Sequence, residues 1–397
     1  MCGPVGGLVL ATGLFFERSF CMAKKRTKNA DVATALATTH KKRREPIEKN
    51  ALLKTGCTVL DLAISGRRAG GFAKGHYFWM CGDSSSGKTF LTLTCLAEAT
   101  LNKAFDNYRF IYDCPERGAL MDFTKHFGSR MVKRLEEPGV DENGAPGCSM
   151  EIEDFYYNVD DALSKAEKPG GTPFIYLLDS MDSLDSKYSE RKFQEAKKAA
   201  RSGTKAKGDY GDGKAKINST RLRRVVARLA KTGSILIILS QTRDNPAAGP
   251  FEEQQTVAGG KSLRFYATVQ LWSSVGSRIK KTINKKEVQV GVHCRVKVKK
   301  NRLTGKERTV EFPIYYDTGI DDLGGMVDFL AYWGYWPKNK TGIIDASVDF
   351  NGIVKQRTAL ISWIEENDLR DDLEDVVEMA WADIERRLAV SRKSKYE

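Results

Sequence analysis

The stretch that decides the fold is HYFWMCGDSSSGKTFLTL, which spans residues 76–93. Its first part, residues 76–81, is a short apolar run that predicts a buried strand. Its middle, residues 82–89, matches G-x-x-x-x-G-K-[ST], in which glycines let backbone N–H groups surround phosphate oxygens. A helical pattern follows over residues 89–101. Because the motif lies between a strand and a helix, the stretch predicts a nucleotide site on an α/β sheet.

Each polar residue of this predicted site has a chemical reason to be there. Lys88 is expected to neutralise charge on the β- and γ-phosphates of ATP, and Thr89 to offer its hydroxyl to Mg²⁺. Asp179 ends the apolar run 174–178, where a carboxylate can hold the Mg²⁺ shell; an ordinary strand-end aspartate is the alternative. The predicted phosphate loop consists of Gly82, Asp83, Ser84, Ser85, Ser86, Gly87, Lys88 and Thr89.

Hydrolysis of ATP also needs a group that activates water. Glu116 lies just beyond the apolar run 108–112 and is the first candidate, while Asp113 is its rival. Gln241 follows the run 234–239, so its amide could sense a γ-phosphate and pass the signal to the next segment. The residues alone leave the choice between Glu116 and Asp113 open.

The pattern of apolar runs predicts the architecture. Continuous runs, rather than alternating ones, are typical of strands buried on both faces of a mainly parallel sheet. Helical patterns such as residues 220–231 supply the crossovers, so the predicted class is α/β with one central sheet flanked by helices. Two alternating stretches predict a hairpin through Thr304 and Gly305. The continuous runs are 76–81, 108–112, 174–178 and 234–239, the alternating stretches are 288–299 and 308–316, and two C-terminal helical patterns are 355–366 and 373–388.

The charge favours polyanionic partners. Lys and Arg outnumber Asp and Glu by 64 to 51, which gives a net charge of +13. The excess is concentrated between residues 187 and 224, where thirteen Lys or Arg stand against four acidic residues, and residues 203–213 are rich in glycine. We interpret this stretch as a phosphate-contacting loop, with a solvated charge run as the alternative.

The cysteine pattern indicates the redox compartment, and the N-terminal residues indicate whether that segment could span a membrane. Eight cysteines without a C-x-x-C pair and only four histidines give no zinc-type spacing, which is typical of reduced core thiols in the cytoplasm. The apolar run 5–16 has no basic residue before it and is too short to span a bilayer. We therefore expect a cytoplasmic protein without a membrane partner. Residues 1–21 are expected to be a mis-called start or a dispensable extension, with Met22 as the initiator; a membrane anchor is the alternative.

Domain boundaries follow from shifts in composition. Residues 22–51 are polar and basic and predict either an arm that contacts another subunit or a solvated tail. The nucleotide-binding core is expected over residues 52–337, and a small C-terminal domain, α/β or helical, over residues 338–397.

Five segments follow one another in an order that a known family shares, namely residues 71–75 with the phosphate loop, LLDS at 177–180, LSQTR at 239–243, GGKSLRFYA at 259–267 and RVKVKKNR at 295–302. Together they resemble the bacterial and phage RecA-type recombinases. The resemblance covers roughly residues 52–337, and its last two segments separate RecA-type recombinases from other P-loop ATPases. The resemblance implies a RecA-like core, ATP with Mg²⁺, single- and double-stranded DNA as partners, and a helical filament of identical subunits.

The resemblance also implies roles for individual residues. Counting back from Gly128, which is expected to close a helix over residues 119–127, puts Glu116 on the family's water-activating glutamate and Phe123 on its adenine-stacking aromatic. Gln241 falls on the γ-phosphate sensor. Lys300 and Arg302 fall on two basic residues that reach the ATP of the neighbouring subunit, so the site would be complete only between subunits.

Two segments, at about 187–218 and 243–260, match the family's DNA-binding loops. Phe251 stands where the family has an aromatic that wedges between bases; a partly buried loop aromatic is the alternative. The predicted DNA-binding residues are Arg191, Lys192, Lys197, Lys198, Arg201, Lys205, Lys207, Arg243, Phe251, Gly259 and Gly260.

Some features depart from the family pattern. The first loop is longer and more basic than usual, YDCPERG carries an extra residue around 113–115, and Arg302 stands where a lysine is common. The chain ends in basic RKSKYE instead of an acidic tail. The leading hypothesis is an ATP-dependent DNA recombinase with DNA-stimulated ATP hydrolysis. The alternatives are a ring-shaped helicase or translocase on the same core, and a nucleotide-gated DNA-binding mediator that lacks strand exchange.

Overall fold

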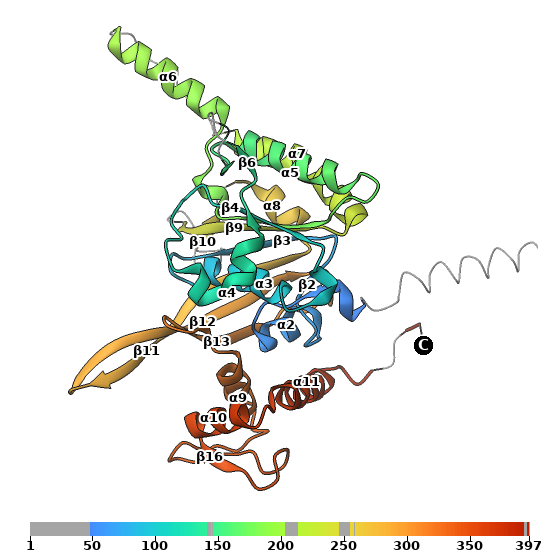
Figure 1. Cartoon of the computed structure of the whole chain (residues 1–397), viewed down its shortest axis with the longest axis vertical. Helices are drawn as coiled ribbons and strands as arrows, with labels where there is room; N and C mark the ends of the chain where they lie inside the picture. Colours follow the sequence, from blue (N-terminus) through green and yellow to red (C-terminus); the bar gives the residue numbers. More distant parts are fainter. Residues whose placement is uncertain are drawn as a thin grey trace, which may run out of the picture. The chain divides into compact units, whose positions relative to one another are not determined.

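The architecture is built on a ten-stranded sheet in the order β14-β13-β12-β11-β3-β9-β8-β4-β5, with β10 paired to β9 (Figure 1). In this computed structural model the described residues are 48–140, 144, 146–202, 213–245, 255–257, 259–392 and 395–396. The strands from β11 through β3, β9, β8 and β4 to β5 pair in parallel, whereas β11 to β14 pair antiparallel. The prediction of an α/β fold with a mainly parallel sheet is confirmed.

Strand positions agree with the apolar runs to within about one residue, except that β9 continues five residues beyond its run. Parallel strands need crossovers that cover both faces, which is why these runs are continuously apolar. The strands of the sheet are β3 Tyr77–Gly82, β4 Arg109–Asp113, β5 Leu135–Glu136, β8 Phe174–Leu178, β9 Ile235–Asp244, β10 Gln255–Val257, β11 Val269–Ile283, β12 Lys286–Asn301, β13 Thr309–Tyr315 and β14 Gly319–Ile320.

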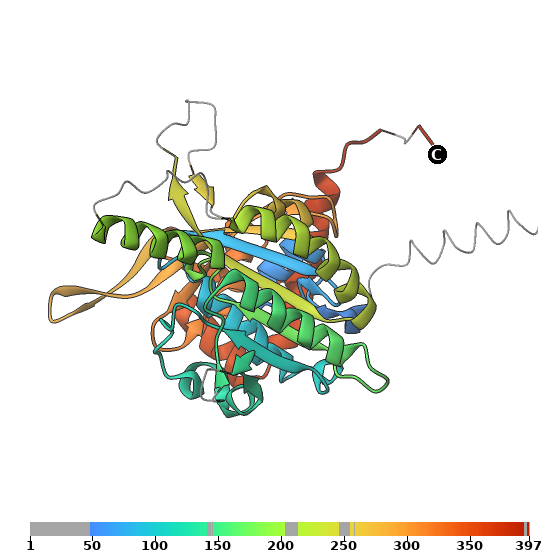
Figure 2. The ribbon, with the colours of Figure 1, turned by 90° about the horizontal axis from the view of Figure 1, so that it is seen from above.

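Helices cover the sheet and connect its strands. Helices α5 and α7 lie side by side over one face, as Figure 2 shows. The helices are η1 Lys49–Ala51, α2 Thr58–Ser65, α3 Lys88–Ala99, η2 Lys103–Phe105, α4 Phe123–Arg134, α5 Ile152–Ala166, η3 Met181–Ser183, α6 Lys187–Arg201, α7 Lys214–Thr232, α8 Lys261–Tyr266, α9 Asp322–Tyr332, α10 Arg357–Glu366 and α11 Arg370–Arg387. Three further two-stranded pairs are β1 Leu52–Leu53 with β2 Phe72–Ala73, β6 Gly139–Val140 with β7 Pro146–Gly147, and β15 Ile343–Asp345 with β16 Val354–Gln356.

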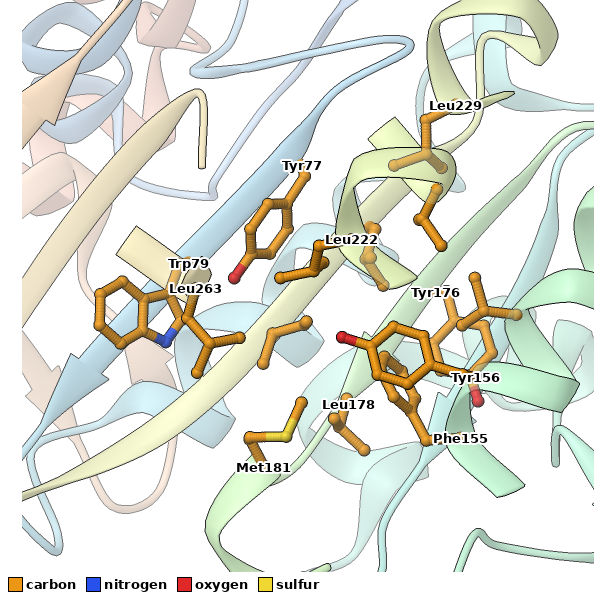
Figure 3. Packing of buried hydrophobic residues seen from close by; sticks show 14 of the residues in the cluster. Tyr77, Trp79, Phe155, Tyr156, Tyr176, Leu178, Met181, Leu222, Leu229 and Leu263 are labelled. Carbon is orange, nitrogen blue, oxygen red and sulfur yellow. The ribbon is translucent and has the colours of Figure 1, made fainter. Parts of the chain in front are cut away.

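The core under α5 and α7 follows from alternation along the strands. Tyr77 and Trp79 of β3 point to this face and join Tyr176 of β8 and Leu222 of α7 in one buried cluster (Figure 3). A buried hydrogen bond joins α5 to α7 in this core: the Tyr156 hydroxyl donates to the Asn218 side-chain oxygen at 2.6 Å. Burial of these large side chains contributes about 25 cal/mol per Å² of apolar area and holds the sheet and helices together.

The predicted helix 119–127 is wrong at its start, whereas Gly128 interrupts the helix at the predicted end. Helix α4 begins at Phe123, because the Asp122 side chain accepts a hydrogen bond from the Lys125 backbone N–H at 3.0 Å and caps it. At Gly128 the φ of 80° and ψ of 153° leave the helical region, so α4 consists of two helical segments, residues 123–127 and 129–134, joined by a kink. The glycine ends the first segment, and the second segment was not predicted.

The basic stretch 187–218 is also different from the predicted loop. Residues 187–201 form helix α6, capped by the Ser186 hydroxyl, which accepts from the Ser189 backbone N–H at 3.1 Å. Its Lys, Arg, Glu, Gln and Ala residues are strong helix formers, and this local preference outweighs their mutual charge repulsion. Helix α7 then starts at Lys214, earlier than the predicted residue 220.

The hairpin through Thr304 and Gly305 is confirmed, because β12 and β13 pair antiparallel across it. The sequence analysis missed the strand before it: β11 and β12 form a longer hairpin that turns at Asn284 and Lys285, both with positive φ. Residues from Lys49 to Glu397 form one compact unit. Boundaries at residues 51 and 337 stay predictions, and the extension 1–21 and most of the arm 22–51 lie outside the described residues.

No helix in the part of the chain that the structure describes is long and apolar enough to cross a bilayer. The apolar run 5–16 lies outside that part.

Candidate functional site

The phosphate loop runs from the last residue of β3 to the first residue of α3. A side chain at Gly82 would place its Cβ 2.1 Å from the Ser273 carbonyl oxygen, and Gly87 has a φ of 83° with its Cβ position 2.8 Å from Ile314 Cδ1. Only glycine fits these close approaches. The loop thus delivers backbone N–H groups at the start of α3, where the helix dipole favours an anion.

Lys88 is held against the loop itself. Its Nζ donates to the carbonyl oxygens of Gly82 at 2.8 Å and Asp83 at 2.6 Å. Burial lowers the pKa of Lys88, while nearby carboxylates such as Asp179 act in the opposite direction. The ammonium is therefore positioned beside the loop, where phosphate oxygens would compete with the two carbonyls for it.

Thr89 and Asp179 lie together, as the sequence predicted for a Mg²⁺ pair. The Thr89 hydroxyl donates to Asp179 Oδ2 at 2.7 Å, and the Tyr112 hydroxyl donates to the same oxygen at 3.3 Å. Burial raises the pKa of Asp179, so an added cation would be favoured there. A hydroxyl and a carboxylate are oxygen ligands of the kind that Mg²⁺ prefers. The sequence analysis did not identify Tyr112.

Glu116 lies at the centre of a cluster formed by the ends of three strands. Its Oε1 accepts hydrogen bonds from the Ser180 hydroxyl, from the Ser183 hydroxyl at 2.9 Å and from Gln241 Nε2 at 3.0 Å. Parallel strands end at one edge of the sheet, which is why residues after β4, β8 and β9 meet. The structure thus places Glu116 and Gln241, two predicted site residues, in direct contact.

Asp113 has a different environment. Its Oδ1 accepts from the Ser149 backbone N–H at 2.8 Å, and its Oδ2 accepts from the Ser149 and Tyr176 hydroxyls at 2.6 Å each. Its side chain is fully buried, and burial raises its pKa. Asp113 is buried with donors on both oxygens, whereas Glu116 is exposed and its described donors all bind Oε1, so the geometry favours Glu116 over Asp113 as the group that meets water.

Gln241 begins the exposed part of β9. Its backbone N–H donates to Asp182 Oδ2 at 2.8 Å, and Arg243 lies 3.8 Å from the other oxygen of Asp182. Beyond it, β9 pairs antiparallel with β10, with Thr242 opposite Val257 and Asp244 opposite Gln255. The hairpin base of the predicted DNA segment 243–260 therefore starts at Thr242, directly after the residue that contacts Glu116.

Gly259 and Gly260 bring the end of that segment against α7. Both have positive φ, and a Cβ on Gly260 would lie 2.7 Å from Ala215 Cβ. The Gly259 carbonyl accepts from the Asn218 side-chain amide at 2.8 Å. The two glycines thus permit a close contact between backbone and helix, and their direct role toward DNA stays a prediction.

Phe123 is the first residue of α4 and is half-buried. Its ring lies 6.0 Å from the Tyr112 ring and lines a cavity of about 610 Å³ together with Cys114, Arg117 and Cys148. This cavity includes no residue of the phosphate loop. Stacking of Phe123 on adenine therefore stays a prediction.

Lys300 and Arg302 lie side by side at the end of β12, away from the phosphate loop of their own chain. Lys300 Nζ donates to the carbonyls of Arg264 at 2.7 Å and Phe265 at 2.8 Å, and Arg302 donates to the Phe265 carbonyl at 3.0 Å. Burial, with Arg302 and Arg264 nearby, lowers the pKa of Lys300 to about 8. Their predicted contact with a neighbouring subunit's ATP lies beyond a single chain.

Helix α6 carries the described part of the predicted basic DNA site. None of its residues is buried, and it extends away from the sheet (Figure 1). Lys192 forms an ion pair with Glu195 at 2.9 Å. Lys205, Lys207 and Phe251 lie outside the described residues. Four exposed cations of α6 form no ion pair with any described residue, namely Arg191, Lys197, Lys198 and Arg201.

Comparison with known proteins gives one consistent relationship. The RecA N-terminal domain family matches residues 198–321. The chain is 26% identical over 312 residues to "Protein RecA" of Campylobacter hominis, with 78% of each chain covered. It is 27% identical over 292 residues to "Protein RecA" of Chlorobaculum tepidum, with 72% of each chain covered. For "Protein RecA" of Synechococcus sp. (strain CC9605) the identity is 26% over 319 residues, with 79% of this chain and 73% of the relative covered. The chain therefore resembles RecA proteins over most of its length, as a divergent relative, and its α/β core is consistent with a RecA-like core.

Proposed function

We propose that this chain is an ATP-dependent DNA recombinase that forms a helical filament on single-stranded DNA and promotes pairing and strand exchange with double-stranded DNA. The observation that carries the proposal is the convergence of Lys88, Thr89, Asp179, Glu116 and Gln241 at one edge of the sheet, beside the base of the predicted DNA segment. A nucleotide bound there would touch residues that lead directly into the DNA segment.

The residues fit ATP with Mg²⁺. The glycine-shaped loop offers backbone N–H groups for the phosphates, and Lys88 offers an ammonium within reach of the same loop. Thr89 and Asp179 would hold Mg²⁺, which when bound neutralises negative charge on the phosphates. Phe123 is proposed to stack on the adenine.

Glu116 is proposed to accept the proton of the water that attacks the γ-phosphate. The two serine hydroxyls and the Gln241 amide donate to Oε1, so they fix the direction of the carboxylate. General base catalysis of this kind contributes about 10²–10⁴ in rate. Gln241 would exchange its contact with Glu116 for one with the γ-phosphate. This exchange would transmit the presence of ATP to the β9–β10 hairpin that follows.

Lys300 and Arg302 are proposed to complete the site of an adjacent subunit. Among the described residues of one chain their side chains donate to backbone carbonyls, for which a charged acceptor could compete. Cations supplied in trans stabilise transition-state charge by about 10³–10⁵ in rate. ATP hydrolysis would then depend on polymerisation on DNA.

DNA is proposed to contact α6 and the segment 243–260. Free cations on a solvent-exposed helix are suited to phosphates, and the release of counterions makes such binding sensitive to salt. Arg243 stands at the junction between this segment and the nucleotide site.

The test is ATP turnover with and without single-stranded DNA, beside a strand-exchange assay and electron microscopy. Wild-type protein should hydrolyse ATP faster on single-stranded DNA and form helical filaments, and Lys88→Ala should abolish ATP-dependent assembly. ATP turnover that ignores single-stranded DNA refutes the recombinase proposal. Closed hexamers on DNA would identify a ring translocase, and filaments without strand exchange would identify a mediator.

A further inference from the structure

A single carboxylate oxygen joins the phosphate loop to both strands of the β9–β10 hairpin. Asp83, the second residue of the loop, accepts a hydrogen bond on Oδ1 from the Thr242 hydroxyl of β9. The same oxygen accepts from Gln255 Nε2 of β10 at 2.9 Å. Thr242 pairs with Val257 in the ladder and Gln255 pairs with Asp244, so Asp83 contacts the hairpin at the first and the last of its three paired positions.

The backbone of Asp83 is part of the nucleotide site. Its carbonyl accepts from Lys88 Nζ at 2.6 Å and from the Ser86 hydroxyl at 2.7 Å. When the Lys88 ammonium turns to phosphate oxygens, the Asp83 carbonyl loses its charged donor. Charge-assisted hydrogen bonds are about twice as strong as neutral ones, so this loss changes the forces on Asp83 substantially.

These contacts form a second connection between nucleotide and hairpin. The first uses Gln241, whose side chain contacts Glu116 and whose backbone contacts Asp182. The Asp83 contacts use different donors and a different acceptor, and the atoms are not shared. A change at the phosphate loop can therefore reach the hairpin without passing through Glu116.

We propose that Asp83 is a positioning residue that couples occupancy of the phosphate loop to the placement of the β9–β10 hairpin, and hence to the response to single-stranded DNA. This inference rests on the proposed function, because it needs a DNA-stimulated ATPase to act on. Coupling requires that the nucleotide site and the DNA site both bias the position of one element. The base of the β9–β10 hairpin is that element, because it contacts the phosphate loop and leads into the proposed DNA segment.

The test uses variants of the hairpin that leave the phosphate loop unchanged. Thr242→Val and Gln255→Ala each remove one donor to Asp83, and the double variant removes both. Thr256→Ala is the matched control, since Thr256 lies between the two ladder positions, is exposed, and makes no recorded side-chain contact with Asp83. ATP turnover is measured with and without single-stranded DNA, together with the KM for ATP and the Tm.

Thr242→Val is expected to keep turnover without DNA and the KM for ATP within about twofold of wild type, and the double variant is expected to lose stimulation by DNA at least fivefold. Asp83→Ala should lose stimulation to the same extent, and adding Gln255→Ala to it should change nothing further, because the shared contact is already absent. Asp83→Asn keeps an acceptor oxygen and should retain most of the stimulation.

Two outcomes are separable. If wild-type turnover is not stimulated by single-stranded DNA, the proposed function fails. If wild type is stimulated and the double variant keeps stimulation within twofold, with only a lower Tm, the contacts are merely structural and this inference is overturned.

Discussion

Replacing Glu116 by Gln should stop ATP turnover while leaving the fold and nucleotide binding intact. Glu116 Oε1 accepts three hydrogen bonds, and an amide oxygen in the same place can accept all of them. The new NH₂ group would replace Oε2, which accepts from no described residue, so the free energy of unfolding should change by no more than about 0.5 kcal/mol. The amide cannot take a proton from water.

The size of the expected fall in kcat follows from the loss of a general base. Such groups contribute about 10²–10⁴ in rate, so kcat on single-stranded DNA should fall by this factor, which equals about 3–5 kcal/mol of barrier height. ATP affinity should be unchanged, and filaments on DNA should become longer-lived because hydrolysis no longer dissolves them. Steady-state phosphate release measures kcat, nucleotide titration measures the ATP affinity, and urea unfolding measures the free energy of unfolding.

Asp113→Ala tests the alternative assignment, in which Asp113 activates the attacking water. It leaves the Ser149 backbone N–H and the Ser149 and Tyr176 hydroxyls without their buried acceptor. The loss should lower the free energy of unfolding by about 2–4 kcal/mol, because each orphaned donor costs about 1–3 kcal/mol and neighbouring losses do not add fully. Turnover per folded molecule should stay within about threefold. The assignment is refuted if Glu116→Gln keeps turnover within threefold, or if folded Asp113→Ala is inactive.

Three further predictions concern other parts of the molecule. The pKa of Lys300, lowered to about 8 from an ordinary 10.5, means that the folded chain binds fewer protons than the unfolded chain between these values, so this lysine's contribution to stability rises with pH there. ATP-dependent assembly, which uses the ammonium, should instead weaken as pH rises through 8, and Lys300→Arg should remove that dependence in sedimentation experiments. Replacing Arg191 and Lys198 of α6 by Gln should reduce the slope of log affinity for single-stranded DNA against log salt by about 1.4, at about 0.7 per phosphate contact, and an unchanged slope would exclude α6 from the DNA contact. Glu374 is buried and pairs with Lys54 at 3.1 Å, so Glu374→Ala should lower the free energy of unfolding by about 1–3 kcal/mol in urea titrations, a value reduced because its partner cations are partly exposed. An unfolding midpoint equal to wild type would contradict the last prediction.

The sequence by itself determined the local elements around the nucleotide. The strand 174–178 was located to the residue, and the strand–loop–helix at 77–99 to within two residues. These features follow from short-range rules, because a buried parallel strand needs a continuous apolar run and a phosphate loop needs glycines at fixed spacing. The family relationship followed from motifs in the right order, and the comparisons agree with it.

Elements with competing local signals were harder to predict. Gly128 breaks the helical path where the sequence predicted, but a second helical segment follows it to Arg134, and the Asp122 cap makes the first segment start at Phe123, later than the predicted residue 119. The basic run of α6 was interpreted as a loop, although its residue types favour a helix once charge is set aside. In both cases the sequence contained two opposing preferences and no measure of which was larger.

Only the tertiary structure decided which polar groups meet. Asp113 and Glu116 are three residues apart, and the choice between them depends on Ser149 and Tyr176, which occupy one carboxylate and leave the other beside Gln241. Asp83 contacts Gln255 across 172 positions of sequence. Periodicity records which face of an element is apolar, but a hydrogen bond needs atoms placed within about 3 Å, and that placement arises only when strands from distant parts of the chain align in one sheet.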